Sequence, residues 1–301
     1  MVRVDPADLS SFLAIARHRS FRKASVELGV TASALSHALR NIEERLGLRL
    51  INRTTRSVAL TEAGQLLYDR ITPAFRDIDD AVEDLNAFRG APTGTLRINA
   101  APAAARIVLL PLVTRFIAAF PDIHVEIALN NALVDVISEG CDAGIRFGET
   151  IAGDMIAVPI GPRQRTAIIA SPDYFKRHAM PREPRDLLKL PCIRYRFSSG
   201  IFYRWEFERG GTELEIEVDG PITLSEQDLM IDAALAGSGI AYVFEGLAAH
   251  HLEAGRLVRV LEDWCPYYPG FFIYYPSRRQ VPAALRAFID FVRRSGPEQT
   301  A

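Results

Sequence analysis

Apolar residues recur at helical spacing in the segment 31–47, which reads TASALSHALRNIEERLG. Steps of four, three and four positions separate Leu35, Leu39, Ile42 and Leu46. This spacing predicts one buried stripe along a helix, with Thr31 as its N-cap and Gly47 at its end. The opposite face then carries short polar side chains and one cation, namely Ser33, Ser36, His37, Arg40 and Asn41.

Two shorter helical patterns precede this segment. The first is amphipathic and aligns four apolar residues, Leu9, Phe12, Leu13 and Ala16. The second covers 21–28 (FRKASVEL) and follows Ser20, a good N-cap residue. Gly29 then interrupts the pattern within the turn LGVT. Two short helices joined by a tight glycine-containing turn are the sequence form of a helix-turn-helix.

Two strand-like runs follow Gly47. The runs LRLI (48–51) and SVAL (57–60) flank the polar, cationic stretch NRTTR (52–56). We therefore predict a hairpin that projects a basic tip beside the helix-turn-helix, which is a wing.

The segment 61–88 carries a longer helical pattern. Its apolar positions step by four, four, three, four and three residues: Leu67, Ile71, Phe75, Ile78, Val82 and Leu85. Heptad-like spacing favours pairing with a second copy, although the helix could also pack on its own domain. Pro73 should bend the helix or crowd its preceding turn. The stretch RGAPTG (89–94) then predicts a hinge.

Strands and helices alternate from Thr95 onward, which predicts an α/β body with mostly parallel strand pairing. The chain should build a first lobe over 95–163, a second over 164–268, and return to the first over 269–295. A cleft is expected between the lobes. The expected strands are LRINA, IHVEIAL, DAGIRF, TAIIAS, CIRYR, IAYVF and GFFIYY, and the expected helices lie within 103–119, 226–236 and 282–294.

Charge divides the chain unevenly. Residues 1–60 contain ten Arg or Lys against five acids, whereas the whole chain has a formal charge of -2. A basic module on an acidic body suggests that the front of the chain meets a polyanion, although a basic solvated face explains the charge equally well. Without a secretory signal or a long apolar run, we expect a cytoplasmic protein and no membrane partner. The three separated cysteines, Cys141, Cys192 and Cys265, are expected to be structural thiols, with redox sensing as the alternative.

These features together resemble the LysR-type transcriptional regulators. The signature runs over 12–64, ending in SHALRNIEERLGLRLINRTTRSVALTEAG, and continues in the body at DAGIRFGE, SPDYF, AALAGSGIAYVFE, GRLVRVLEDW and YPSRRQVPAALRAFIDF. The resemblance implies a winged helix-turn-helix DNA-binding domain over 1–60 and a dimerising linker helix with its hinge over 61–94. It also implies an effector-binding domain over 95–301 with the type II fold of periplasmic binding proteins.

The implied function is transcription control by a small molecule bound between the two lobes. The implied partners are a dyad-symmetric operator in double-stranded DNA, a small-molecule effector, and a second copy in a homodimer or homotetramer. RNA polymerase is a further candidate partner, and neither a cofactor nor a metal is expected.

Two positions depart from the family pattern. Lys23 and Ser25 flank Ala24 where relatives usually have two adjacent alanines. In NAAPAAA (99–105), Ala and Pro stand where many relatives place a Ser or Thr that helps hold an anionic effector. The second departure weakens the expectation of a simple carboxylate ligand.

The helix over 31–47 should enter the major groove, because small residues such as Ala32 and Ser33 let its backbone approach the bases. Ser36, His37 and Arg40 are then the candidates for base contacts, with phosphate contact or mere solvation as the alternative. Ser20 and Thr31 could add phosphate bonds to their capping role. The wing tip should contact phosphates or a minor groove through Arg53, Thr54, Thr55 and Arg56.

The family pattern places nine residues in the effector cleft: Ala101, Pro102, Arg146, Phe147, Gly148, Tyr195, Phe197, Asp228 and Phe244. The aromatic residues would suit a flat metabolite, and Arg146 could engage an acidic group. Alternatively, Arg146 pairs with Asp142 or Glu149 and the aromatic residues belong to the core.

Three other functions compete with this interpretation. For an enzyme, a catalytic triad could be drawn from the following residues: Asp142, His124, Ser198, Ser199, His250 and His251. However, no GxSxG, HExxH, phosphate-loop or dinucleotide motif occurs in the sequence. GSGIA (237–241) precedes a strand and is better explained as a turn. A free solute-binding protein would need an export signal and lack the N-terminal module. A constitutive DNA-binding regulator with a vestigial cleft remains open.

Overall fold

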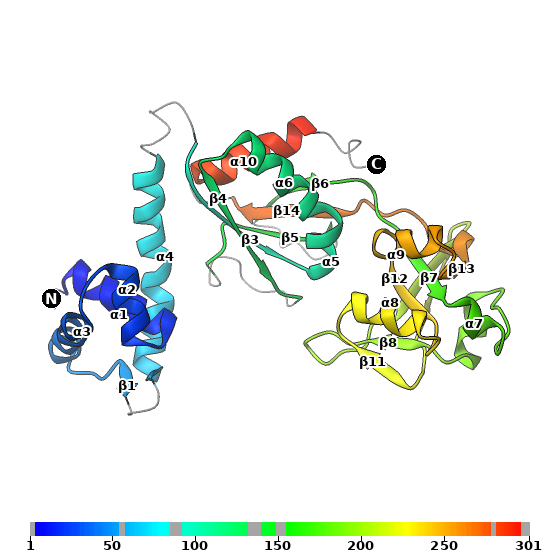
Figure 1. Cartoon of the computed structure of the whole chain (residues 1–301), viewed down its shortest axis with the longest axis horizontal. Coiled ribbons are helices and arrows are strands. Elements are labelled where there is room, and N and C mark those ends of the chain that lie inside the picture. The colour runs from blue at the N-terminus through cyan, green and yellow to red at the C-terminus, as the bar shows by residue number, and fades with distance from the viewer. Residues whose placement is uncertain are drawn as a thin grey trace. The chain divides into compact units, whose positions relative to one another are not determined.

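The computed structural model describes residues 4–53, 58–84, 92–131, 140–148, 155–277 and 281–295. The chain divides into two compact units, the N-terminal unit Met1–Leu85 and the C-terminal unit Asn86–Ala301 (Figure 1).

Three helices form the body of the N-terminal unit: α1 (Pro6–His18), α2 (Phe21–Leu28) and α3 (Ala32–Leu46). The apolar stripes expected from the sequence meet in one core that includes Phe12, Leu35 and Leu39, each 1% exposed or less. Both predicted N-caps are confirmed. The Ser20 hydroxyl accepts from the Lys23 amide, and the Thr31 hydroxyl accepts from the amide of Ala34 at 3.2 Å.

The wing is a two-stranded hairpin of β1 (Ile51–Arg53) and β2 (Val58–Leu60), which pair antiparallel. The first strand was expected over 48–51, so that boundary is wrong. The amides of Leu50 and Ile51 instead donate to the Glu43 carboxylate on α3, at 2.8 and 3.2 Å. These two hydrogen bonds connect the start of the wing to α3, and β1 therefore begins only at Ile51. The tip, 54–57, lies outside the described residues.

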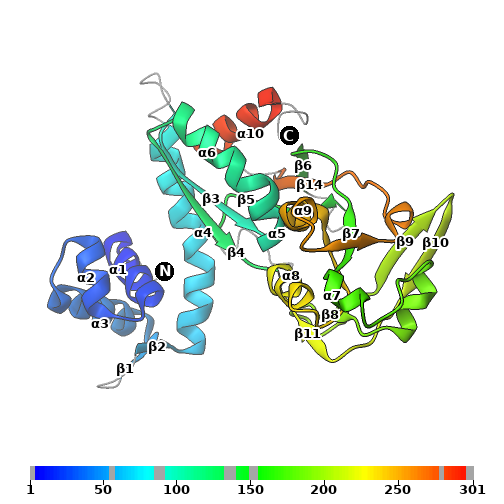
Figure 2. The same cartoon turned by 45° about the vertical axis from the view of Figure 1, so that its right-hand side comes forward.

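Helix α4 (Glu62–Asp84) follows the wing and is drawn as one helix in Figures 1 and 2. It contains Pro73 within its span. Its first half packs on the N-terminal core through Leu67 and Ile71. Its second half leaves Ile78 and Val82 58% and 60% exposed. Packing on its own domain therefore accounts for only part of the apolar stripe, whose last member, Leu85, lies outside the described residues.

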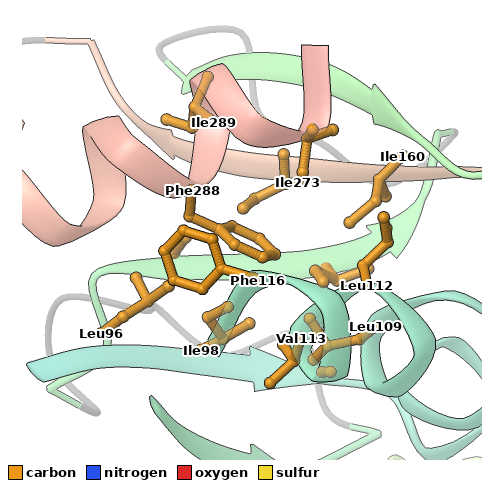
Figure 3. Close-up of a cluster of buried hydrophobic side chains, with 14 of the residues drawn as sticks. Leu96, Ile98, Leu109, Leu112, Val113, Phe116, Ile160, Ile273, Phe288 and Ile289 are labelled. Atoms are coloured by element: carbon orange, nitrogen blue, oxygen red, sulfur yellow. The ribbon is translucent and has the colours of Figure 1, made fainter. Parts of the chain in front are cut away.

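The first lobe of the C-terminal unit is built on a five-stranded sheet in the order β4-β3-β5-β14-β6. Its strands are β3 (Gly94–Ala100), β4 (Ile123–Leu129), β5 (Ala143–Phe147), β6 (Met155–Ile160) and β14 (Phe271–Pro276). The helical segments are α5 (Pro102–Ala104), the π-helical turn η2 (Ala105–Leu109), α6 (Leu110–Ala119) and α10 (Ala283–Ser295). Figure 3 shows the core of this lobe, where Phe116 of α6 faces Phe288 of α10 beside Leu96 and Ile98 of β3.

The second lobe contains three small sheets. Its strands are β7 (Thr166–Ala170), β8 (Ile193–Tyr195), β9 (Trp205–Arg209), β10 (Thr212–Ile216), β11 (Ile222–Leu224), β12 (Ala241–Phe244) and β13 (Val258–Val260). Its helices are α7 (Pro172–Phe175), η4 (Pro184–Lys189), α8 (Gln227–Leu235), α9 (Glu245–Glu253) and η5 (Glu262–Trp264).

The expectation of mostly parallel pairing is wrong. Among the described strands of this unit, only three pairs are parallel, β3 with β4, β3 with β5, and β8 with β11. The other five pairs are antiparallel. In the first lobe the cause is β14, which returns from the second lobe and enters the sheet against the direction of both of its neighbours.

Two segments connect the lobes, because the chain leaves the first sheet after β6 and rejoins it at β14. They pair where Gln164 and Tyr268 exchange two backbone hydrogen bonds, at 3.1 and 2.7 Å. The lobes are thus joined by a short two-stranded crossing.

One described helical stretch, Pro102–Ala119, is long and apolar enough by length and composition to cross a membrane. Its Leu112, Val113 and Phe116 side chains are buried in the core of the first lobe, however. We therefore assign this stretch as a core helix.

Candidate functional site

The predicted recognition face lies on the outer side of α3. Ala32, Ser33, His37 and Arg40 are exposed and Ser36 is half-buried, whereas the apolar stripe of the same helix is in the core. The Thr31 and Ser33 hydroxyls lie 2.9 Å apart. This face therefore offers short polar groups and one cation along a capped helix start.

Arg53 ends β1 and brings a cation from the wing to the start of α2. Its guanidinium carbon lies 4.4 Å from the centroid of the Phe21 ring, a cation–π distance. Phe21 directly follows the cap residue Ser20. The remaining predicted residues of the wing, Thr54, Thr55 and Arg56, lie outside the described residues.

The departure at Lys23 and Ser25 leaves the packing of α2 intact. Ala24 between them is fully buried, and the Ser25 hydroxyl donates to the carbonyl of Arg22 at 2.9 Å. The extra polar groups therefore do not displace the buried alanine.

A cavity of about 900 Å³ lies in the C-terminal unit and draws its walls from both lobes. Eight of the nine residues expected in the cleft line it: Ala101, Pro102, Arg146, Phe147, Tyr195, Phe197, Asp228 and Phe244. Gly148 is not among the lining residues. A side chain there would instead meet the Phe272 ring at 2.6 Å.

Aromatic rings form most of the apolar wall. Phe147 and Phe244 lie 5.6 Å apart between centroids, and Phe271 lies 5.3 Å from Phe244. On the side of the second lobe, Tyr195 meets Phe197 edge to face at 5.2 Å. A flat ring could insert between such surfaces.

Several lining residues were missed from the sequence: Ala103, Asn131, Thr166, Ser198, Ser199, Tyr203, Glu206, Glu226, Gln227, Tyr242, Leu247, Tyr268 and Phe271. A local signal existed for Tyr242, because it stands two positions before Phe244 on β12 and so shares its face. For Tyr203, Glu206 and Tyr268 no local pattern indicates the pocket.

Arg146 is buried in the floor of this pocket. Its guanidinium donates to the side chain of Asn99 at 2.5 Å and to the carbonyls of Ile145 and Asn130 at 2.8 and 3.0 Å. Burial lowers its pKa. These bonds join β5 to β3 and to the residue after β4, so Arg146 has a structural role as well as facing the cavity. Of its two suggested acidic partners, Asp142 accepts from the Arg97 amide at 2.7 Å and Glu149 lies outside the described residues.

Carboxylates stand on the other walls of the cavity. Asp228 forms an ion pair with Arg106 at 2.8 Å. Glu226 accepts from the Asn131 side chain at 3.1 Å, and burial together with nearby Asp228 raises its pKa. The Tyr242 hydroxyl donates to the backbone carbonyl of Glu206 at 3.0 Å.

The residues considered for an enzyme sit on separate elements. His124 is on β4, whereas His250 and His251 are on α9, and both Ser198 and Ser199 line the cavity. Within the described ranges, no group of three or more His, Cys, Asp or Glu residues could hold a metal ion.

All three cysteines are buried. Burial raises the pKa of the Cys192 thiol to about 12 and also raises the pKa of Cys265. A raised pKa disfavours the reactive thiolate, which supports the structural interpretation of these two residues.

Comparisons with known proteins match both units. A family model described as bacterial regulatory helix-turn-helix protein, lysR family, matches residues 6–65. A second, described as LysR substrate binding domain, matches residues 89–297.

Two relatives from Escherichia coli (strain K12) match nearly end to end. The HTH-type transcriptional regulator YcaN is 46% identical over 292 residues, which cover 97% of this chain and 96% of the relative. The HTH-type transcriptional regulator PgrR is 41% identical over 297 residues, covering 98% and 99%.

Two solved structures are similar along their whole length. The full-length structure of the Vibrio cholerae virulence activator AphB has a TM-score of 0.64 at 25% identity and covers 96% of this chain and 98% of its own. CrgA from Neisseria meningitidis has a TM-score of 0.58 at 25% identity, with coverage of 98% and 100%.

Proposed function

This chain belongs to the LysR family of bacterial transcriptional regulators, and on that basis we propose a role for each of its two units. It is a DNA-binding regulator with an effector-binding domain. Our proposal concerns the residues that contact DNA and effector, the paired state, and the coupling between the two units. A regulator of promoters acts where the DNA is, so we place it in the cytoplasm.

We assign α3 as the helix that enters the major groove. The observation that carries this assignment is the exposed row on α3, where small side chains precede His37 and Arg40. Small residues allow close approach, and Arg40 could bind guanine through two hydrogen bonds. Arg53 and the wing would contact the backbone beside this groove, with Ser20 and Thr31 adding phosphate bonds at the helix starts.

Arg53→Ala tests this arrangement. We expect weaker binding to every DNA sequence and a salt-dependence slope reduced by about one unit, because one phosphate contact is lost. Binding would be measured by fluorescence anisotropy over a salt series, with the DNA upstream of the coding region and an unrelated duplex. Ser36→Ala should instead change the ratio between the two duplexes.

Arg182→Ala is the matched control for Arg53→Ala, since it removes an exposed cation from the C-terminal unit. An unchanged salt slope in the Arg53 variant would contradict the phosphate contact.

We propose that the second half of α4 pairs with a second copy of the chain. Ile78 and Val82 are exposed at heptad spacing, and a paired helix would remove both from water. Two copies would then present two recognition helices to a dyad-symmetric site. Further pairing into a tetramer, and a contact with RNA polymerase, belong to the same proposal.

The double variant Ile78→Glu, Val82→Glu should shift the protein toward monomers by at least tenfold in dissociation constant, because two like-charged pairs would face each other in the seam. Analytical ultracentrifugation measures this shift. Gln65→Glu is the control, since Gln65 is exposed on α4 and does not belong to the apolar stripe. Unchanged self-association in the double variant would exclude α4 as the pairing helix.

Effector control requires that the ligand prefer one arrangement of the protein. We propose that a ligand in the 900 Å³ cavity changes the angle between the lobes at the crossing of Gln164 and Tyr268. That change would reach the DNA-binding units through residues 89–94 and α4. Footprints of equal length and bending with and without a bound ligand would contradict this coupling.

A further inference from the structure

The ionisable side chains that line the cavity are mostly acidic. Among the described lining residues, three carboxylates, Glu206, Glu226 and Asp228, stand against one guanidinium, Arg146. Neither lysine nor histidine is among these lining residues. The cavity walls therefore carry more negative than positive charge.

The one cation among the described lining residues is held by the protein itself. Arg146 donates to three oxygens of Asn99, Ile145 and Asn130, so three of the five N–H groups of its guanidinium are already committed to holding strands together. The neighbouring stretch has no side-chain donor at Ala101 or Pro102, and the helix start there has no side-chain cap, so an anion at this wall would have to rely on backbone amides alone. A negative ligand would gain one partly committed partner and would be repelled by the lining carboxylates, of which Asp228 is already paired with Arg106.

The carboxylates are not equally compensated. Asp228 has Arg106 at 2.8 Å. The hydrogen bond that Glu226 accepts comes from a neutral amide, at 3.1 Å from Asn131. Its environment disfavours its charge, as its raised pKa indicates. A positive ligand group beside Glu226 would supply the missing counter-charge.

The aromatic walls suit the same kind of ligand. The faces of phenyl and phenol rings attract cations through their quadrupole, and a positive group within about 6 Å of a ring centroid gains from this attraction. Tyr195, Phe197 and Tyr203 lie on the second-lobe side of the cavity with Glu206 and Glu226. A site that combines carboxylates with aromatic ring faces suits a ligand that carries a basic group on an apolar skeleton.

We propose that the effector is a cation, a flat or aromatic molecule that bears an amino or similar basic group, with Glu226 as its principal counter-charge. This inference rests on the proposed effector role of the cavity. It differs from the suggestion that Arg146 could engage an acidic group of the ligand.

The test uses two matched sets of probes on the full chain. The first set is 2-phenylethylamine, 2-phenylethanol and phenylacetate, and the second is tryptamine, tryptophol and indole-3-acetate. Within each set the ring stays the same while the charge changes. Thermal shift and isothermal calorimetry should show that the amine raises Tm and binds about tenfold more tightly than its neutral and acidic counterparts.

Glu226→Gln should weaken amine binding about tenfold and leave the neutral probe unchanged, because it removes one charge at nearly constant shape. Glu253→Gln is the matched control, since Glu253 is exposed on α9 and does not line the cavity. Amine binding should also strengthen as the pH rises from the ordinary titration range of a glutamate toward neutrality, because Glu226 with its raised pKa must ionise to pair with the ligand.

Several results would overturn the proposal. These are tightest binding by the acid, equal binding of amine and alcohol, equal loss in both glutamine variants, or no Tm shift by either amine at about 10 mM. Tightest binding by the acid together with its loss in Arg146→Gln would leave the cavity as an effector site and overturn only the inferred charge. A failure of the proposed DNA binding would be detected separately, in the fluorescence anisotropy measurements on Arg53→Ala.

Discussion

Replacing Phe116 by alanine should lower the free energy of unfolding of the C-terminal unit by about 3–5 kcal/mol. The Phe116 side chain is fully buried. Its ring meets Phe288 edge to face (Figure 3), at 5.0 Å between centroids, and it also meets Phe120 at 4.9 Å. Truncation removes the buried area and leaves a cavity between α6, α10 and the sheet. Interiors of this density relax only partly, so most of the lost contact energy is not recovered.

Urea denaturation followed by tryptophan fluorescence would measure this loss. The chain has two tryptophans, Trp205 and Trp264, and both belong to the C-terminal unit, so the signal reports that unit. Leu110→Ala is the control on the same helix, because Leu110 is 56% exposed and should change stability by no more than about 0.5 kcal/mol. A loss under about 1 kcal/mol for Phe116→Ala would show that the core can collapse around the truncation.

Gly64→Ala should disrupt the N-terminal unit where α4 passes the wing. An added Cβ would lie 2.0 Å from the backbone oxygen of Leu50, and that oxygen accepts the Thr61 amide at 2.9 Å. Neither partner is a flexible side chain, so the backbone must move. Overpacking of this kind costs about 1–3 kcal/mol and sometimes more, and here it strikes the connection between wing and helix.

The variant should therefore lose most of its DNA affinity while its tryptophan unfolding curve stays unchanged. Gel mobility shift and urea denaturation would measure the two properties on the same sample. Gln65→Ala is the control, since this neighbouring side chain is exposed and should leave DNA affinity intact. Full DNA affinity in Gly64→Ala would mean that the wing adapts freely to the shift.

The helices of the N-terminal unit could be predicted because local signals agree there. In α3 the apolar stripe, the Thr31 cap and the left-handed Gly47 at φ 66° all indicate the same boundaries. The start of β1 could not be predicted, since it depends on Glu43 reaching back from α3 to the Leu50 and Ile51 amides. A long-range contact of this kind leaves no periodic pattern.

The hairpin β9–β10 was missed although the sequence carried a signal for it. Gly210 and Gly211 both have positive φ, 59° and 79°, and two adjacent glycines between alternating strands are a strong hairpin pattern. The direction of β14 was beyond local analysis, because nothing within FFIYYP indicates which neighbours it joins.

The residues that line the pocket also fall into two groups, those that the sequence indicated and those that only the folded chain brings there. Family position brought Phe147, Tyr195 and Phe244 to the cavity wall. Glu206 and Tyr268 reach the same wall from β9 and from the crossing segment, and only the folded lobes bring them together. The acidic balance of the lining comes largely from Glu206 and Glu226, which the sequence did not indicate. The sequence suggested that Arg146 could engage an acidic group, whereas we propose a basic ligand.

Under the proposed binding of DNA by α3 and the wing, the carboxylate of Glu43 has a consequence for which operators fit. It fixes the distance between the axis of α3 and the root of the wing through two hydrogen bonds. A helix seated against base edges and a hairpin lying over the neighbouring backbone would then span a set width of duplex. Operators whose groove is too wide or too narrow for that span would incur an elastic penalty even when every contacted base is correct.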